Sequence, residues 1–95
     1  MYAIAVIRYR KPLEEVLKVV DEHRAYLRDL KARKILVASG PLEPRFGGAL
    51  LLRVENADAA LLAVRDGDPF VKHGMAQYEL LPWLPTIGLE DLDRA

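Results

Sequence analysis

The chain has 95 residues, with 14 basic and 14 acidic side chains and a formal net charge of zero. This length predicts one domain with a modest hydrophobic core. The balanced charge and the lack of a basic run argue against a nucleic-acid partner, because phosphates require a clustered positive surface. The absence of cysteine excludes disulfides, thiolate nucleophiles and cysteine-bound metals.

The N-terminal segment, residues 2–9, predicts a strand rich in Ile, Val and Tyr. Residues 3–7 are apolar without alternation, which indicates a strand that is covered on both faces. The order of apolar and then basic residues is the reverse of a secretory signal, and no apolar run approaches the roughly 18 residues that span a membrane. We therefore expect a soluble, cytoplasmic protein with no membrane partner.

A period of three to four residues replaces the strand pattern from Leu13 onward and extends to Leu30. Acids lie in its first turn and the basic run KARK at its end, so the pattern predicts one amphipathic helix after Pro12. Two more apolar segments, residues 35–42 and 49–54, predict strands joined by the loop EPRFGG.

The remaining segments continue the alternation of helix and strand. Residues 57–67 predict a second helix, for which Asn56 or Asp58 is a candidate N-cap. Residues 75–83 predict a fourth strand, and the pattern predicts no element for residues 84–95.

The order of elements, β-α-β-β-α-β, predicts an α+β fold of the ferredoxin-like type, with a four-stranded antiparallel sheet and both helices on one face. We expect this domain to span residues 1–83, with residues 84–95 as a C-terminal tail. The first and third strands are apolar on both sides, although the two helices cover only one. A second copy of the same sheet is the simplest cover, so we expect a homodimer through the open sheet face.

One of the two histidines falls within the apolar stripe of the long helix. His23 lies three residues after Val20 and four before Leu27, so its side chain is expected to face the sheet. Two interpretations remain open. A buried histidine can be structural and satisfied by one hydrogen bond. It can also act as a general acid or base, because imidazole titrates close to neutral pH.

The segment DGDPFVKHG, residues 66–74, separates the second helix from the last strand. Asp68 followed by Pro69 is typical of the N-cap and first position of a short helix. In the predicted fold this segment lies beside the first helix, so the Asp68 carboxylate can also hold the His23 imidazole and fix its tautomer. His73 ends the same short helix, where its side chain is expected to bond the last free carbonyl groups.

Two further residues are candidates for substrate binding. Ser39 ends the second strand and can offer its hydroxyl to the same cleft, although the glycine pattern of a nucleophile elbow is absent. Arg45, in the EPRFGG loop, can neutralise an anionic substrate or remain a solvated loop charge. No metal motif or phosphate-binding glycine loop is present, and no cofactor is expected. The third strand also lacks the aromatic residues with which RNA-recognition modules stack bases.

Several short motifs follow one another in a characteristic order along residues 1–83. With these motifs the sequence resembles the YciI-like (YCII-related) family of small bacterial domains. The motifs are His23-Arg24-Ala25-Tyr26-Leu27, Ser39-Gly40-Pro41-Leu42, Gly47-Gly48, Asp68-Pro69-Phe70-Val71, and Tyr78-Glu79 through Pro82-Trp83.

The resemblance implies a dimeric α/β-barrel, similar to the muconolactone-isomerase-like superfamily, in which two sheets pack face to face. It also implies that His23 and Asp68 form an active-site pair. The best-understood chemistry of the family is the removal of chloride from a chlorinated hydroxyquinol-type aromatic, whereas most members have no established reaction.

Two functions from different classes follow from these observations. The first is a small-molecule enzyme, in which His23, oriented by Asp68, transfers a proton during elimination of HX or isomerisation. Ser39 and Arg45 would orient its substrate. The second is a non-catalytic dimeric domain that binds a small metabolite or serves as an accessory module.

Overall fold

The computed structural model describes residues 1–55 and 57–95. The candidate cap Asn56 lies outside the described residues, and Asp58 lies in the first turn of its helix. The elements in chain order are β1 (Tyr2–Tyr9), α1 (Leu13–Val16), α2 (Val20–Ala32), β2 (Leu36–Pro41), β3 (Gly47–Arg53), α3 (Ala57–Gly67), α4 (Pro69–Lys72), β4 (Ala76–Trp83) and α5 (Leu89–Arg94).

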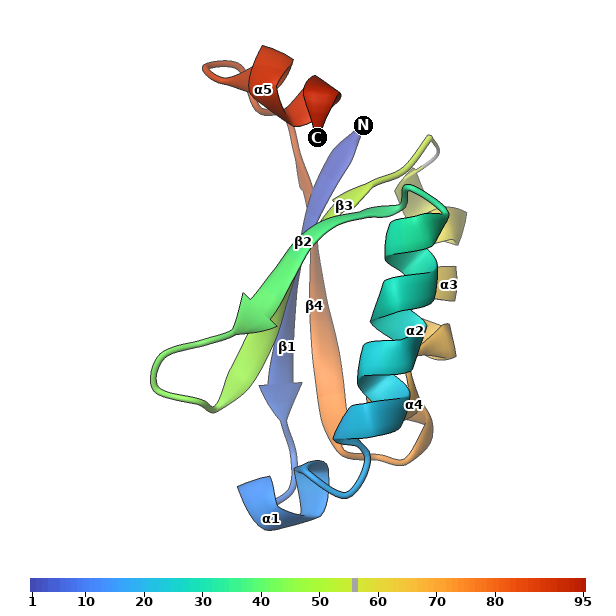
Figure 1. Cartoon of the computed structure of the whole chain (residues 1–95), viewed down its shortest axis with the longest axis vertical. Helices are drawn as coiled ribbons and strands as arrows, with labels where there is room; N and C mark the ends of the chain where they lie inside the picture. Colours follow the sequence, from blue (N-terminus) through green and yellow to red (C-terminus); the bar gives the residue numbers. More distant parts are fainter. Residues whose placement is uncertain (56) are drawn as a thin grey trace.

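The four strands form one antiparallel sheet in the order β2-β3-β1-β4. Helices α2, α3 and α4 lie along one face of this sheet (Figure 1). This arrangement confirms the predicted ferredoxin-like α+β fold. None of the helices within the described residues combines the length and the apolar character that a membrane span needs.

The predicted long helix is divided into two, which the amphipathic pattern did not indicate. The chain turns at residues 17–19, where the Lys18 and Val19 amides donate to carbonyls three residues earlier. Such bonds tighten the turn and let α2 change direction to follow the sheet, whereas α1 lies beyond the end of β1 (Figure 1). Leu13 and Leu17 are consequently 40% and 46% exposed instead of buried.

The core lies between the sheet and the helices. Ala3, Ala5 and Ile7 of β1 are buried on the helix-covered face, and Ala5 pairs with Leu50 of β3. Alternate residues such as Ile4 point to the opposite face and remain partly exposed. The apolar run of β1 therefore reflects two different surfaces, of which this chain covers one.

β3 begins with a glycine because its backbone approaches β1 closely. A Cβ atom on Gly47 would lie 1.8 Å from the carbonyl oxygen of Ile7. Any larger residue would separate the two strands at the end of the sheet that adjoins the hairpin loop.

The C-terminal residues form α5, which the sequence pattern did not predict. The Tyr2 hydroxyl donates to the Asp93 carboxylate at 2.7 Å, and the Arg53 guanidinium donates to the Leu92 carbonyl. These bonds attach α5 to the end of the sheet where β1 begins (Figure 1).

Candidate active site

The two residues predicted to act together do meet in the fold. His23 lies on the face of α2 that packs against the sheet and is only 8% exposed. Its Nδ1 atom lies 2.8 Å from the Oδ1 atom of Asp68, which is fully buried. Asp68 follows His23 by 45 residues, so only the tertiary fold brings the two side chains together.

The local structure around Asp68 explains how the carboxylate reaches this position. Asp68 is the N-cap of α4, with an extended backbone, and Pro69 occupies the first helical turn. The Oδ1 atom accepts a hydrogen bond from the Phe70 amide at 2.9 Å in addition to the contact with His23. The capping prediction is confirmed, and the same oxygen atom serves both the cap and the histidine.

A third hydrogen-bond donor completes the surroundings of the carboxylate. The Tyr78 hydroxyl, from the helix-covered face of β4, donates to the Oδ2 atom of Asp68. Burial and the negative charge of Asp68 raise the pKa of Tyr78 far above its ordinary value, so the hydroxyl keeps its proton. Three donors therefore stabilise the buried carboxylate without a lysine or arginine partner among the described residues.

The role of Tyr78 was missed at the level of sequence, where it appeared only within a family motif. A usable signal was present, because Tyr78 and the buried Ala76 lie two residues apart and therefore share the helix-covered face of β4. A tyrosine on that face needs a hydrogen-bond partner, and Asp68 lies ten residues earlier in the chain.

Aromatic packing holds the imidazole ring in place. The ring of Phe70 stacks on the ring of His23, with centroids 3.8 Å apart and an interplanar angle of 8°. The ring of Tyr9 packs nearly perpendicular to the ring of Phe70, with the two centroids 6.0 Å apart. Phe70 thus has two roles. Its amide donates the capping hydrogen bond to Asp68, and its ring restricts the orientation of the His23 imidazole.

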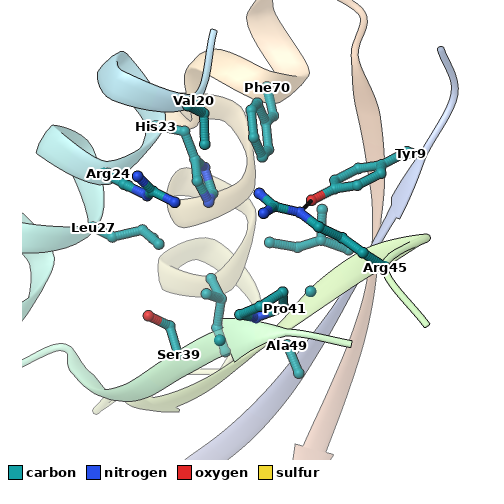
Figure 2. Close-up of a pocket in the computed structure, with 14 residues that line it drawn as sticks. Tyr9, Val20, His23, Arg24, Leu27, Ser39, Pro41, Arg45, Ala49 and Phe70 are labelled. Carbon is teal, nitrogen blue, oxygen red and sulfur yellow. Dashed lines mark hydrogen bonds between the residues drawn. The ribbon is translucent and has the colours of Figure 1, made fainter. Parts of the chain in front are cut away.

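The imidazole opens onto a cavity of about 220 Å³ between α2 and the β2–β3 hairpin (Figure 2). Most of its walls are apolar, and the polar side chains are few. It is lined by Ile7, Tyr9, Val20, His23, Arg24, Leu27, Ser39, Gly40, Pro41, Arg45, Gly48, Ala49, Leu50 and Phe70.

Ser39 reaches the cavity because β2 contains an irregularity. The pairing between β2 and β3 shifts between Leu36 and Ala38, so that Leu36 opposes Leu52 and Ser39 opposes Leu50. Without the shift, Ser39 would point to the opposite face from Leu36. The sequence placed Ser39 at the end of the strand, but it did not indicate the irregularity that turns the side chain toward the helices.

Arg45 also lines the cavity, where its Nε–H donates to the Tyr9 hydroxyl at 3.3 Å. Arg24 and Tyr9 line the same cavity but were not among the residues singled out from the sequence. The position of Arg24 next to His23 was the available signal, since adjacent helical residues project about 100° apart and can border one concavity.

His73 lies outside the cavity. It ends α4, as expected, but its Nε2 atom lies 3.2 Å from the Glu22 carboxylate of α2 instead of contacting helix carbonyls. Among the residues described by the structure, no group of three His, Asp or Glu side chains is arranged to hold a metal ion.

Fold and site together define a small ferredoxin-like domain in which a buried histidine–aspartate pair adjoins a cavity. The chain belongs to the family of the YCII-related domain, whose model matches residues 1–84. This confirms the family to which the sequence motifs pointed. No curated protein matches the sequence closely enough to indicate a relative.

A solved structure with the same fold is that of 5-chloro-2-hydroxyhydroquinone dehydrochlorinase (TftG) from Burkholderia phenoliruptrix AC1100, in complex with 2,5-dihydroxybenzoquinone. The TM-score is 0.78 and the sequence identity is 22%, with 92% of this chain and 97% of that chain covered. The similarity extends over nearly the whole of both chains and concerns the fold.

Proposed function

We propose that this protein is an enzyme in which His23 and Asp68 transfer a proton on a small molecule, by elimination of HX or by isomerisation. The observation that supports this proposal most strongly is the 2.8 Å contact between His23 Nδ1 and Asp68 Oδ1 beside an open cavity. The dehydrochlorinase activity named for the similar solved structure favours elimination.

The geometry of the pair supports Nε2 as the ring nitrogen of His23 that accepts the proton of the substrate. A buried carboxylate at Nδ1 favours the tautomer with its proton on Nδ1, so Nε2 is left to accept a proton. In an elimination, Nε2 takes a proton from a hydroxyl or carbon atom, the released electron pair forms a double bond, and the halide leaves with its bonding pair. The charge of Asp68 stabilises the imidazolium that forms.

In an isomerisation, the same imidazolium returns the proton to a different atom of the substrate. The Ser39 hydroxyl and the Arg45 guanidinium, which both line the cavity, would orient the substrate in either reaction. This function belongs to the domain of residues 1–83, and the tail that follows contributes no residue to the cavity lining.

We further propose that the protein acts as a homodimer through the uncovered face of the sheet. Ile4, Val6 and Leu51 lie on that face and are only partly buried, while Leu81 remains 41% exposed. A second sheet would remove these side chains from water and leave the cavity, on the helix-covered face, accessible.

The proposal is tested by chloride release from 5-chloro-2-hydroxyhydroquinone, the compound that appears in the name of the structurally similar dehydrochlorinase. His23→Gln is expected to lower the rate by about 10²–10⁴-fold, because it removes the general base. His73→Gln is the matched control, since its side chain is half exposed and lies outside the cavity. Circular dichroism verifies that both variants are folded.

Unchanged chloride release in His23→Gln would remove the imidazole from the mechanism. Binding of the compound by the wild-type protein without turnover would favour the second hypothesis, a non-catalytic domain that binds a small metabolite.

Asp68→Asn separates the charge of the carboxylate from its hydrogen-bond geometry. The Phe70 amide needs an acceptor, so the amide oxygen of the new side chain should occupy the position of Oδ1 and still accept from His23. Its NH₂ group would then face Tyr78, whose hydroxyl can rotate to accept. We therefore expect a lower rate with an unchanged tautomer, which imidazole ¹⁵N chemical shifts report.

A further inference from the structure

The cavity contains two positively charged side chains that the proton-transfer pair does not use. Arg24 follows His23 on α2, and Arg45 lies in the loop between β2 and β3. In Figure 2 the His23 imidazole lies between them, and both guanidinium groups point toward the cavity. Two distant segments of the chain therefore place positive charge on both sides of the proposed base.

Neither guanidinium is paired with a carboxylate in the part of the chain that the structure describes. Among the described residues, the Arg45 side chain forms a hydrogen bond only with the Tyr9 hydroxyl, at 3.3 Å. Arg33, the C-cap of α2, shows the contrasting arrangement, since it pairs with Asp29 at 3.0 Å. The described residues that line the cavity include no Asp or Glu. The positive charge at the cavity is thus available to a ligand.

An adjoining groove extends this positive surface. It shares Arg24, Leu27 and Ser39 with the cavity and adds Arg28 and Lys31 from α2. Its described lining residues also include no acid. Because the whole chain has a net charge of zero, this is a local concentration of positive charge, which attracts anions to the cavity.

The remaining walls restrict the size and shape of a ligand. The volume of about 220 Å³ is below the range of roughly 300–1,000 Å³ that is usual for drug-sized ligands. Apolar side chains, among them Ile7, Leu27 and Pro41, surround the space between the charged groups. Guanidinium groups are planar and match the two oxygen atoms of a carboxylate, and they can also donate to the single charged oxygen atom of an enolate.

We propose that the cavity binds a small planar organic anion, a carboxylate or an acidic enol, whose charge lies between Arg24 and Arg45. This inference rests on the proposed function, because it assigns the charge of the molecule that would meet His23. The same two guanidinium groups would stabilise negative charge that develops on a substrate oxygen as the imidazole removes a proton.

The test compares benzoate with benzamide, which has nearly the same shape and no charge. Binding to the full-length protein is measured by titration, followed by ¹H–¹⁵N NMR spectra. We expect benzoate to bind about tenfold more tightly than benzamide, and to shift the amide signals of Arg24 and Arg45. Equal affinities, or no shift with benzoate up to about 10 mM, would overturn the proposal.

Variants locate the effect. Arg24→Gln and Arg45→Gln are each expected to weaken benzoate binding about fivefold and to leave benzamide binding unchanged. Arg33→Gln removes the same charge at the C-terminal cap of α2, outside the cavity and the groove, and it is expected to have little effect. An equal loss of benzoate binding in all three variants would mean that only the total charge of the protein matters, which contradicts a specific site.

These measurements are independent of turnover, so the two proposals can fail separately. Benzoate binding that depends on Arg24 and Arg45 would stand even if chloride release were unaffected by His23→Gln. Loss of chloride release in His23→Gln, together with equal binding of benzoate and benzamide, would retain the proton-transfer pair and reject the anionic substrate.

Discussion

Replacing Tyr78 with phenylalanine removes one hydroxyl group and leaves one oxygen of a buried carboxylate without a donor. Asp68 is 0% exposed, and among the described residues only Tyr78 donates to its Oδ2 atom. The other oxygen already accepts from His23 at 2.8 Å and from Phe70 at 2.9 Å. Since the carboxylate is inaccessible to bulk water, the lost hydrogen bond is not replaced.

The cost follows from the charge on the acceptor. A hydrogen bond to a charged group contributes about 1.5–3 kcal/mol, so we expect Tyr78→Phe to lower the free energy of unfolding by about 2 kcal/mol. Typical domains are stabilised by only about 5–15 kcal/mol in total. For a domain of this size, the loss corresponds to a fall in Tm of about 10 °C.

Urea denaturation measures this loss, with the fluorescence of Trp83, the single tryptophan, and far-UV circular dichroism as probes. The transition midpoint should fall while the m-value stays the same. Tyr9→Phe is the matched control, because the one hydrogen bond of the Tyr9 hydroxyl within the described part of the chain is the exposed bond from Arg45, at 3.3 Å. Its cost should stay within about 0.5 kcal/mol. Equal losses in the two variants would refute the conclusion that Tyr78 stabilises the buried charge.

Two further predictions concern alkaline pH and the uncovered sheet face. Burial and Asp68 raise the pKa of Tyr78 above 10.0, so the folded chain keeps a proton that the unfolded chain loses. The stabilisation is therefore fully present below about pH 10, the ordinary pKa of tyrosine. Above this pH the free energy of unfolding falls by about 1.4 kcal/mol per pH unit through Tyr78, and the raised pKa of Tyr26 acts in the same direction. Urea denaturation between pH 9 and 11 should show a shallower decline in Tyr78→Phe, and parallel declines would contradict this origin. Leu51→Glu places a charge in the middle of the uncovered face and should yield monomers in sedimentation experiments; a wild-type protein that is itself monomeric would refute the proposed dimer.

Local patterns in the sequence predicted the order of the strands and main helices, and they also indicated the two residues of the central pair. They predicted neither the division between α1 and α2 nor the helix α5. A continuous apolar run gives way to a period of three to four residues from Leu13 onward, and this change separates β1 from the helical segment. The same period directs His23 toward the sheet. The Asp68–Pro69 step indicates a helix start through local backbone chemistry alone. These features depend on residues within one or two turns of each other, and such neighbours are visible in a linear pattern.

The construction of the cavity depends on contacts between segments that lie far apart in the chain. An irregularity in β2 turns Ser39 to the helix-covered face, and the turn at residues 17–19 directs α2 along the sheet. The third donor to Asp68 comes from β4, and Arg24 and Arg45 approach the imidazole from separate segments. Each of these arrangements depends on strand register or on the path of the backbone. Packing across the whole sheet sets the strand register and the path of the backbone. Contacts between distant segments determine which of several similar strand pairings has the lowest free energy, and local preferences do not distinguish these pairings.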